Sequence, residues 1–123
     1  MSATDYPYRA RLRSKSQFLR VLGQGRIYPG RECIVRLCEN EVGFARLGMA
    51  APRQYGNAVR RNRFRRLVRA AFRELQDELG GVDVFVAPRR GLDEPTLAGL
   101  RADLMTAPAN AREQRPRGAR RRR

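Results

Sequence analysis

Residues 53–73 read RQYGNAVRRNRFRRLVRAAFR, and this stretch predicts a long amphipathic helix. At about 100° per residue, the apolar side chains here and just beyond fall on one stripe: Phe64, Leu67, Val68, Ala71, Phe72, Leu75 and Leu79. The opposite side carries a polar set: Asn62, Arg65, Arg66, Arg69 and Arg73, with Arg63 toward one edge. We predict a helix from about Asn57 to Leu79, ended by Gly80 and Gly81.

The charges of this helix run against its own dipole. Eight arginines and no acid lie between Arg53 and Arg73, and the acids follow at Glu74, Asp77 and Glu78. A helix prefers acids at its start and bases at its end, although each misplaced charge costs only ~0.3–1 kcal/mol. A solvated basic face does not require this one-sided distribution, whereas a phosphate backbone along the first half of the helix explains it. The pattern therefore predicts nucleic-acid binding.

The whole chain shares this positive excess. Its 123 residues include 27 basic and 12 acidic ones, which gives a formal net charge of +15. Such an excess favours a polyanionic partner, which leaves nucleic acid, an anionic membrane or an acidic protein. No apolar run approaches the ~20 residues that span a bilayer, and Met1 to Arg13 lacks the apolar core of a signal peptide. We therefore expect a cytoplasmic protein without a membrane partner.

The segments around the long helix predict a single α+β domain. The expected elements are a helix from Ser14 or Ser16 to about Leu22, a short strand around Gly25–Tyr28, strands at Glu32–Glu39, Val42–Ala51 and Val82–Ala87, and a last helix from Asp93 or Thr96 to about Met105. The strands on either side of the turn-like Glu39-Asn40-Glu41 are predicted to pair as an antiparallel hairpin. This order favours an α/β two-layer sandwich.

Composition divides the chain into three parts. Residues 1–13 are predicted to form a basic N-terminal arm, and residues 14–107 a folded RNA-binding domain. Residues 108–123 are rich in Pro, Arg, Gly and Ala, so they lack the apolar side chains that a core needs. We therefore expect them to form a disordered Arg-rich tail.

Candidate catalytic residues are few. The chain has no histidine, the usual general acid or base. Cys33 and Cys38 are five residues apart in one predicted strand, so they should lie on opposite faces and form neither a disulfide nor a metal site. The sequence also lacks a serine elbow and a phosphate-binding glycine loop. We therefore expect no active site on the protein itself, no protein-held metal and no small-molecule substrate.

Residues 53–69, RQYGNAVRRNRFRRLVR, resemble the signature of the protein subunit of bacterial ribonuclease P. That family shows a basic residue, two variable positions and Gly-Asn-Ala-Val, followed by a helix with Arg-Asn-Arg. The flanks also resemble the family at Arg11-Leu12, at Phe18 with Gly25, at Arg46-Leu47-Gly48 and at Asp83–Ala87. The resemblance covers about residues 9–104.

The resemblance implies a fold and an activity. The fold would be a sandwich with a small mixed sheet, in which the basic helix joins two parallel strands by a left-handed crossover. The activity would be endonucleolytic maturation of the 5′ end of precursor tRNA. A catalytic RNA subunit would perform the hydrolysis with Mg²⁺ ions held mainly by that RNA and the substrate. The expected partners are therefore the catalytic RNA subunit and precursor tRNA.

The resemblance also implies two sets of site residues. The set that would dock on the catalytic RNA subunit is Arg53, Asn57, Arg61, Asn62, Arg63, Arg65, Arg66 and Arg69. A groove between the first helix and the sheet would hold the single-stranded 5′ leader, through Lys15, Phe18 and Arg36. From the residues alone, Phe18 fits a core position as well as a base-stacking one.

The chain departs from the family in this groove. A second aromatic side chain is often found one helical turn after Phe18, and another on the facing strand. Leu22 and the stretch from Cys33 to Arg36 take those places here. Arg36 would then take the place of the missing aromatic side chain. It could stack its guanidinium on a base or pair with a leader phosphate, provided that it faces the groove.

Two other classes of protein share part of this pattern. A structural RNA-binding protein, such as a ribosomal component, would have the charge and the small α+β form without requiring the Gly-Asn-Ala-Val and Arg-Asn-Arg run. A DNA-compacting protein would have an elongated or dimeric basic arm instead of a basic helix in a folded domain. The ordered residues of the signature favour the ribonuclease P subunit.

Overall fold

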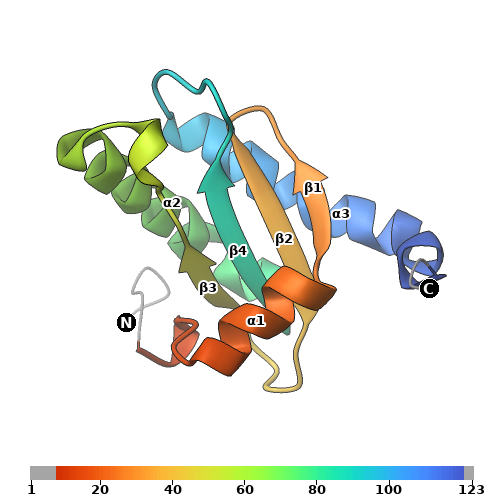
Figure 1. Cartoon of the computed structure of the whole chain (residues 1–123). Helices are drawn as coiled ribbons and strands as arrows, with labels where there is room; N and C mark the ends of the chain where they lie inside the picture. The colour runs from red at the N-terminus through yellow and green to blue at the C-terminus, as the bar shows by residue number, and fades with distance from the viewer. Residues whose placement is uncertain (1–7, 121–123) are drawn as a thin grey trace.

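A four-stranded sheet with helices on both faces forms the molecule (Figure 1). The computed structural model describes the backbone of residues 8–120 and the side chains of residues 9–108. The strands are β1 (Arg26–Pro29), β2 (Cys33–Glu39), β3 (Arg46–Met49) and β4 (Val82–Pro88). The helices are α1 (Lys15–Gln24), α2 (Ala58–Leu79) and α3 (Leu97–Arg120), with short 3₁₀ turns at Tyr8–Ala10 and Arg53–Tyr55. The predicted α+β class is confirmed.

The order of the strands is β1-β2-β4-β3, so the predicted hairpin between the second and third strands is wrong. β4 lies between them and pairs antiparallel with β2 and parallel with β3. The hairpin of the sheet is instead β1–β2, with Tyr28 opposite Val35. Composition indicates that a segment is extended, but the partner of an extended segment depends on contacts that are distant in the sequence.

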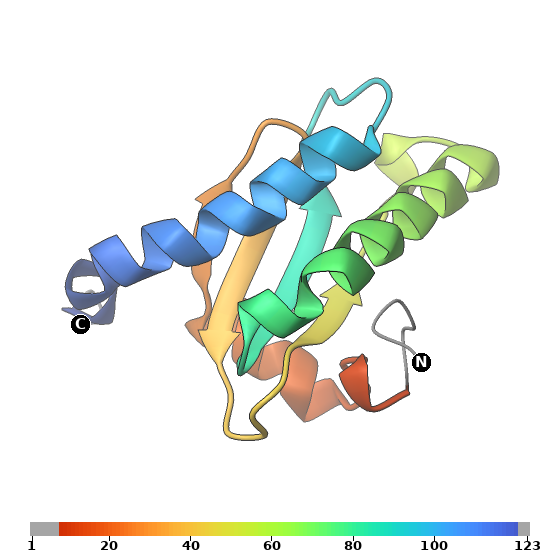
Figure 2. The ribbon, with the colours of Figure 1, turned by 180° about the vertical axis from the view of Figure 1, so that it is seen from behind.

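The connection from β3 through α2 to β4 is a left-handed crossover. In Figure 2 the two strands point upward, α2 lies in front of the sheet, and the chain passes from β3 on the right to β4 on the left. Nearly all crossovers between parallel strands have the opposite hand. The handedness that the family resemblance implied is therefore present.

The apolar stripe predicted for α2 forms the main core. Phe64, Val68, Ala71, Phe72 and Leu75 are buried, and Leu67 and Leu79 are partly buried against them. They share this core with inward side chains of the sheet and of α3: Val35, Leu37, Val84, Val86, Leu100 and Leu104. The helix ends at Gly80, whose φ of 71° suits glycine because it has no Cβ. One side of α2 is thereby committed to the interior.

The first helix crosses the opposite face of the sheet (Figure 1). Ser14 caps it, because its side-chain oxygen accepts a hydrogen bond from the Gln17 N–H. The Gln17 side-chain oxygen in turn accepts one from the Ser14 N–H. The Phe18 ring packs edge-to-face on Phe85 of β4, with ring centres 6.1 Å apart. Gly48 lies beneath this contact, because a Cβ there would lie only 2.7 Å from Phe18 Cε1. Phe18 is therefore a packing residue as well as a candidate binding residue.

Both ends of the chain differ from the prediction. Ala10 and Leu12 are buried, and the Leu12 N–H donates to the Leu47 carbonyl at 2.9 Å along the edge of β3. The described part of the predicted arm thus belongs to the domain, while residues 1–7 lie outside the described residues. The last helix continues to Arg120 and does not end near Met105, although Pro108 lacks an N–H donor. The disordered tail from residue 108 stays a prediction.

Candidate nucleic-acid interface

The side of α2 that faces away from the core carries most of the predicted RNA-binding residues. Asn62, Arg63 and Arg66 are exposed, and Arg61, Arg65 and Arg69 are partly exposed. Arg53, which precedes the helix in a 3₁₀ turn, is also exposed. The helical repeat brings these residues together because the opposite side is buried. We call this set, with Asn57, the α2 basic face.

Two asparagines of the α2 basic face have roles within the protein. Asn57 is the N-cap of α2, and its Oδ1 accepts a hydrogen bond from the Arg60 N–H at 2.9 Å. The Oδ1 of Asn62 accepts from Arg65 Nη1 at 3.0 Å. Each carbonyl oxygen therefore already accepts one hydrogen bond within the protein. Sequence reasoning placed both residues on the face but did not reveal these bonds.

The charge of the α2 basic face is almost uncompensated. Among the described contacts, the only ion pair to an arginine of this face joins Arg63 Nε and Glu94 Oε1 at 3.5 Å. Both side chains are more than half exposed, so this pair is weak and readily exchanged. The face thus offers several guanidinium groups whose geometry suits bidentate phosphate contacts.

Arg60 makes more contacts within the protein than the other described arginines of the run, of which Arg61 Nε donates to the Gly56 carbonyl at 3.2 Å. The guanidinium of Arg60 turns toward the loop after β4, where Nη2 donates to the carbonyls of Leu92 at 3.1 Å and Asp93 at 2.7 Å. It also lies over the ring of Tyr55, 4.8 Å from its centre. The sequence pattern included Arg60 among the arginines of the run, and the fold uses it internally.

The three candidate leader-binding residues lie on the α1 side of the sheet or at its edge. Lys15 is exposed in the first turn of α1. Arg36 stands opposite Phe85 in the sheet register, and its Nη1 donates a long 3.4 Å hydrogen bond to the Leu22 carbonyl of α1. Arg36 therefore faces α1, as the resemblance required. Leu22, at the place of the expected second aromatic residue, is 37% exposed.

A buried carboxylate that sequence reasoning missed ties β4 to β3. Asp83 is fully buried and accepts from Arg46 Nε at 2.8 Å and Nη2 at 3.0 Å. Asn40 Nδ2 donates to it at 2.9 Å, and Arg20 Nη1 of α1 lies 3.7 Å away. Such a bidentate pair holds its partners in a defined orientation. The network thus holds β3 against β4, and the longer ion pair to Arg20 links it to α1.

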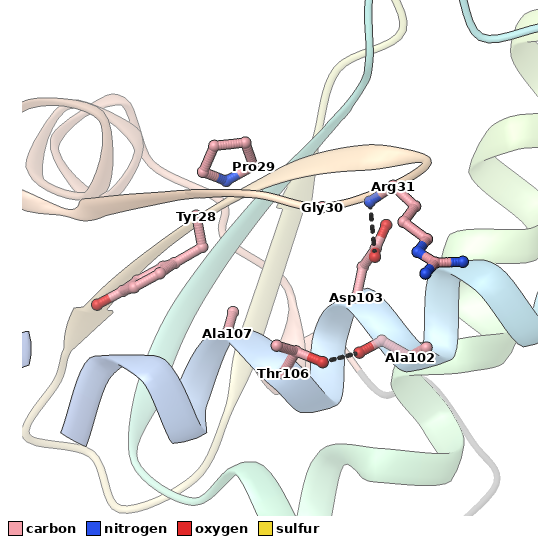
Figure 3. Close-up of a pocket in the computed structure, with 8 residues that line it drawn as sticks. All are labelled: Tyr28, Pro29, Gly30, Arg31, Ala102, Asp103, Thr106 and Ala107. Atoms are coloured by element: carbon pink, nitrogen blue, oxygen red, sulfur yellow. Dashed lines mark hydrogen bonds between the residues drawn. The ribbon is translucent and has the colours of Figure 1, made fainter. Parts of the chain in front are cut away.

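A second buried carboxylate closes the β1–β2 turn (Figure 3). Asp103 of α3 accepts hydrogen bonds from the backbone N–H groups of Arg31, Glu32 and Cys33, at 2.9, 2.9 and 3.1 Å. Gly30 allows this approach, since a Cβ there would overlap the carboxylate. Burial, followed by the charge of Asp103, raises the pKa of the Cys33 thiol. Cys33 is therefore an unreactive core residue.

Neither a metal cluster nor a membrane span is found where the chain is described. No group of three or more His, Cys, Asp or Glu side chains there could hold a metal ion. No described helix is both long and apolar enough to cross a bilayer. Cys33 and Cys38 are free thiols on opposite faces of β2, as their spacing predicted.

Comparison with known proteins decides the family. A sequence model of the family described as Ribonuclease P matches residues 6–112. The chain belongs to the ribonuclease P protein family. A ribonuclease P protein component of Chlamydia trachomatis is 32% identical over 106 residues, which cover 85% of this chain and 88% of the relative. Another, of Oleidesulfovibrio alaskensis, is 41% identical over 88 residues, 68% of this chain and 70% of the relative.

Solved structures of ribonuclease P proteins have the same fold. A Staphylococcus aureus RNase P protein superposes with a TM-score of 0.71 at 26% identity, over 83% of this chain and 94% of that one. The RNase P protein of Thermotoga maritima gives a TM-score of 0.70 at 30% identity, over 79% and 95%. As a member of the ribonuclease P family, the chain is the protein component of a tRNA-processing ribonucleoprotein endonuclease. The ribosomal-type alternative is not supported.

Proposed function

We propose that the α2 basic face docks on the catalytic RNA subunit of ribonuclease P. The observation that carries this proposal is a helix with one side wholly in the core and the other lined with arginines. Arg53, Arg61, Arg63, Arg65, Arg66 and Arg69 would contact phosphates, and Asn57 and Asn62 would donate through their amide groups. One guanidinium group can bind two oxygens of the same phosphate, which fixes the orientation of the protein on the RNA as well as supplying affinity.

The α1 side of the sheet would bind the 5′ leader of precursor tRNA. Lys15 supplies a charge at its edge, and Arg36 supplies a guanidinium within reach of α1. The Phe18 ring already packs on Phe85, so only its remaining exposed surface is available to a base. We therefore assign the larger share of leader binding to Arg36, through a phosphate contact or stacking.

The protein contributes binding and orientation to the reaction. Mg²⁺ ions, held mainly by the catalytic RNA and the substrate, would supply charge stabilisation and an activated water. The arginines of this chain would neutralise phosphates that otherwise repel one another where the two RNAs meet. The reaction would take place in the cytoplasm, where these RNA partners are found.

The test is release of the 5′ leader from precursor tRNA by the catalytic RNA of the same organism at low Mg²⁺. We expect the protein to accelerate release, because its arginines replace part of the charge neutralisation that Mg²⁺ provides. Arg101→Met is the control variant and should accelerate release as the original protein does, since Arg101 of α3 is bound to Glu74 of α2 and lies outside both proposed surfaces. Absence of stimulation at every Mg²⁺ concentration would contradict the proposed function.

A further inference from the structure

Arg60 is the arginine of the run whose contacts are made mainly inside the protein. Its Nη2 donates to two successive carbonyls, Leu92 at 3.1 Å and Asp93 at 2.7 Å, in the loop between β4 and α3. Its Nε is buried without a hydrogen-bond partner among the described residues. Arg60 is partly exposed as a whole, but with Nη2 bound to two carbonyls and Nε buried, chiefly Nη1 is left for a phosphate.

The surroundings of Arg60 are shaped to hold it. The Tyr55 ring lies under the guanidinium at 4.8 Å and packs edge-to-face on the core residue Phe64. Gly56 leaves the space that the side chain crosses, because a Cβ there would lie 2.7 Å from Arg60 Cδ. Arg60 therefore joins three segments: the 3₁₀ turn before α2, the first turn of α2 and the loop after β4.

The loop that Arg60 holds reaches the α2 basic face. Glu94 follows the two bound carbonyls directly and pairs with Arg63, which lies one turn after Arg60 in α2. If the loop were released, Glu94 and the start of α2 would sample several arrangements. RNA binding would then have to order them, and that ordering lowers affinity.

We propose that Arg60 is a positioning residue for RNA docking and not a phosphate contact. It holds the loop after β4 against the start of α2, so that the α2 basic face is ordered before RNA arrives. The inference rests on the proposed docking of α2. Arginines of one run would then have two roles, positioning and phosphate contact. Affinity alone does not distinguish these roles, but the salt dependence of affinity does.

The test compares Arg60→Met with Arg66→Met, an exposed arginine of the α2 basic face. Affinity for the catalytic RNA is measured over a range of salt concentrations, well below the melting temperature, with folding checked by circular dichroism. We expect Arg60→Met to weaken binding roughly tenfold, because RNA binding must then order the loop that the two lost hydrogen bonds held, without changing the log–log salt slope. Arg66→Met should reduce the slope by about 0.7–0.9, the value for one phosphate contact.

Conservative variants give a second readout. Both carbonyls are bound by one nitrogen, Nη2. A lysine side chain keeps the charge but is one atom shorter, so its Nζ should fall short of the two carbonyls and Arg60→Lys should bind as weakly as Arg60→Met. Tyr55→Leu removes the ring beneath the guanidinium and should weaken binding with an unchanged slope. Tyr55→Phe should retain full affinity, because the Tyr55 hydroxyl has no hydrogen-bond partner among the described residues.

The outcomes separate this inference from the proposed function. A reduced slope in Arg60→Met would show that Arg60 contacts phosphate and would overturn the inference. Full rescue by lysine would show that the charge alone is sufficient, and would overturn it too. Unchanged affinity in folded Arg60→Met would overturn it as well. If Arg66→Met changed neither affinity nor slope, the proposed docking of α2 would fail first and the inference with it.

Discussion

At the scale of single residues, the same side chain type does three different things in this protein. Arg66 is exposed on α2, Arg60 is held between a ring and two carbonyls, and Arg46 is bound to the buried Asp83. Only the first role follows from position on a helical repeat. The other two depend on groups more than thirty residues away, which no local pattern contains.

Replacing Asp83 should destabilise the fold strongly. Asp83→Asn keeps the size of the side chain but leaves the Arg46 guanidinium, whose side chain is 12% exposed, without a counter-charge. Loss of one partner of a buried pair costs roughly 3–5 kcal/mol of unfolding free energy. Urea denaturation followed by circular dichroism measures this difference.

The matched control for Asp83 is Glu94→Gln, in an exposed pair with Arg63. Exposed ion pairs contribute about 0–1 kcal/mol, so this variant should unfold at nearly the same urea concentration as the original protein. Equal effects of the two variants would mean that the buried network around Asp83 does not stabilise the sheet.

At the scale of elements, sequence periodicity predicted the helix α2 correctly but predicted the wrong pairing of the strands. The stripe from Phe64 to Leu79 identified α2 and its buried side correctly, because a helix makes its backbone hydrogen bonds within itself. The segments of β2 and β3 were recognised, but the hairpin between them was wrong. β4 enters between these strands only after α2 has returned the chain, and composition carries no signal of that insertion.

The α2 basic face yields a prediction about salt dependence. Replacing both Arg65 and Arg69 with Ala should weaken binding to the catalytic RNA and lower the log–log salt slope by ~0.7–0.9 for each lost contact. Binding titrations between low and moderate salt measure the slope. The control is Arg101→Ala on α3, which should leave the slope unchanged. A slope that stays constant in the double variant would mean that these side chains point away from phosphate.

As with the fold, the part of the candidate site that lies on one helix could be predicted from the sequence, whereas the part that joins several elements could not. The α2 basic face followed from charge placed on one side of a regular helix. The leader-binding surface needed the family resemblance, because Lys15, Phe18 and Arg36 come from separate elements. That Arg36 faces α1 became clear only from the sheet register, which places it opposite Phe85. The braces at Asp83, Asp103 and Arg60 had no sequence signal.

At the scale of the whole molecule, the sheet separates the two proposed RNA surfaces. α2 lies on one face with α3, and α1 lies on the other (Figure 1, Figure 2). Both helices pack on the same sheet, so the α2 basic face and the α1 side keep a fixed relation. Such a layout would let one small protein contact a catalytic RNA and a substrate leader at the same time, as proposed above.

The C-terminal region should add affinity without selectivity. Residues 112–123 contain seven arginines and one glutamate, which favours salt-sensitive binding to any RNA. Deleting them should weaken RNA binding at low salt, with little effect at high salt, and should leave the sheet and leader preference intact. A chain of full length with these arginines replaced by Gln is the control for length. Altered leader preference in either variant would assign the region a specific role.

The bond between Asp103 and the β1–β2 turn has a consequence for the order of events during synthesis. The turn leaves the ribosome about seventy residues before the carboxylate that closes it, and β4 also follows β2 and β3 by a whole helix. The arginines of α2 are therefore translated before the sheet can be completed. Until Asp103 has been synthesised, the chain carries the arginines of α2 on an incomplete fold, so an RNA that bound them early would do so before the β1–β2 turn is closed.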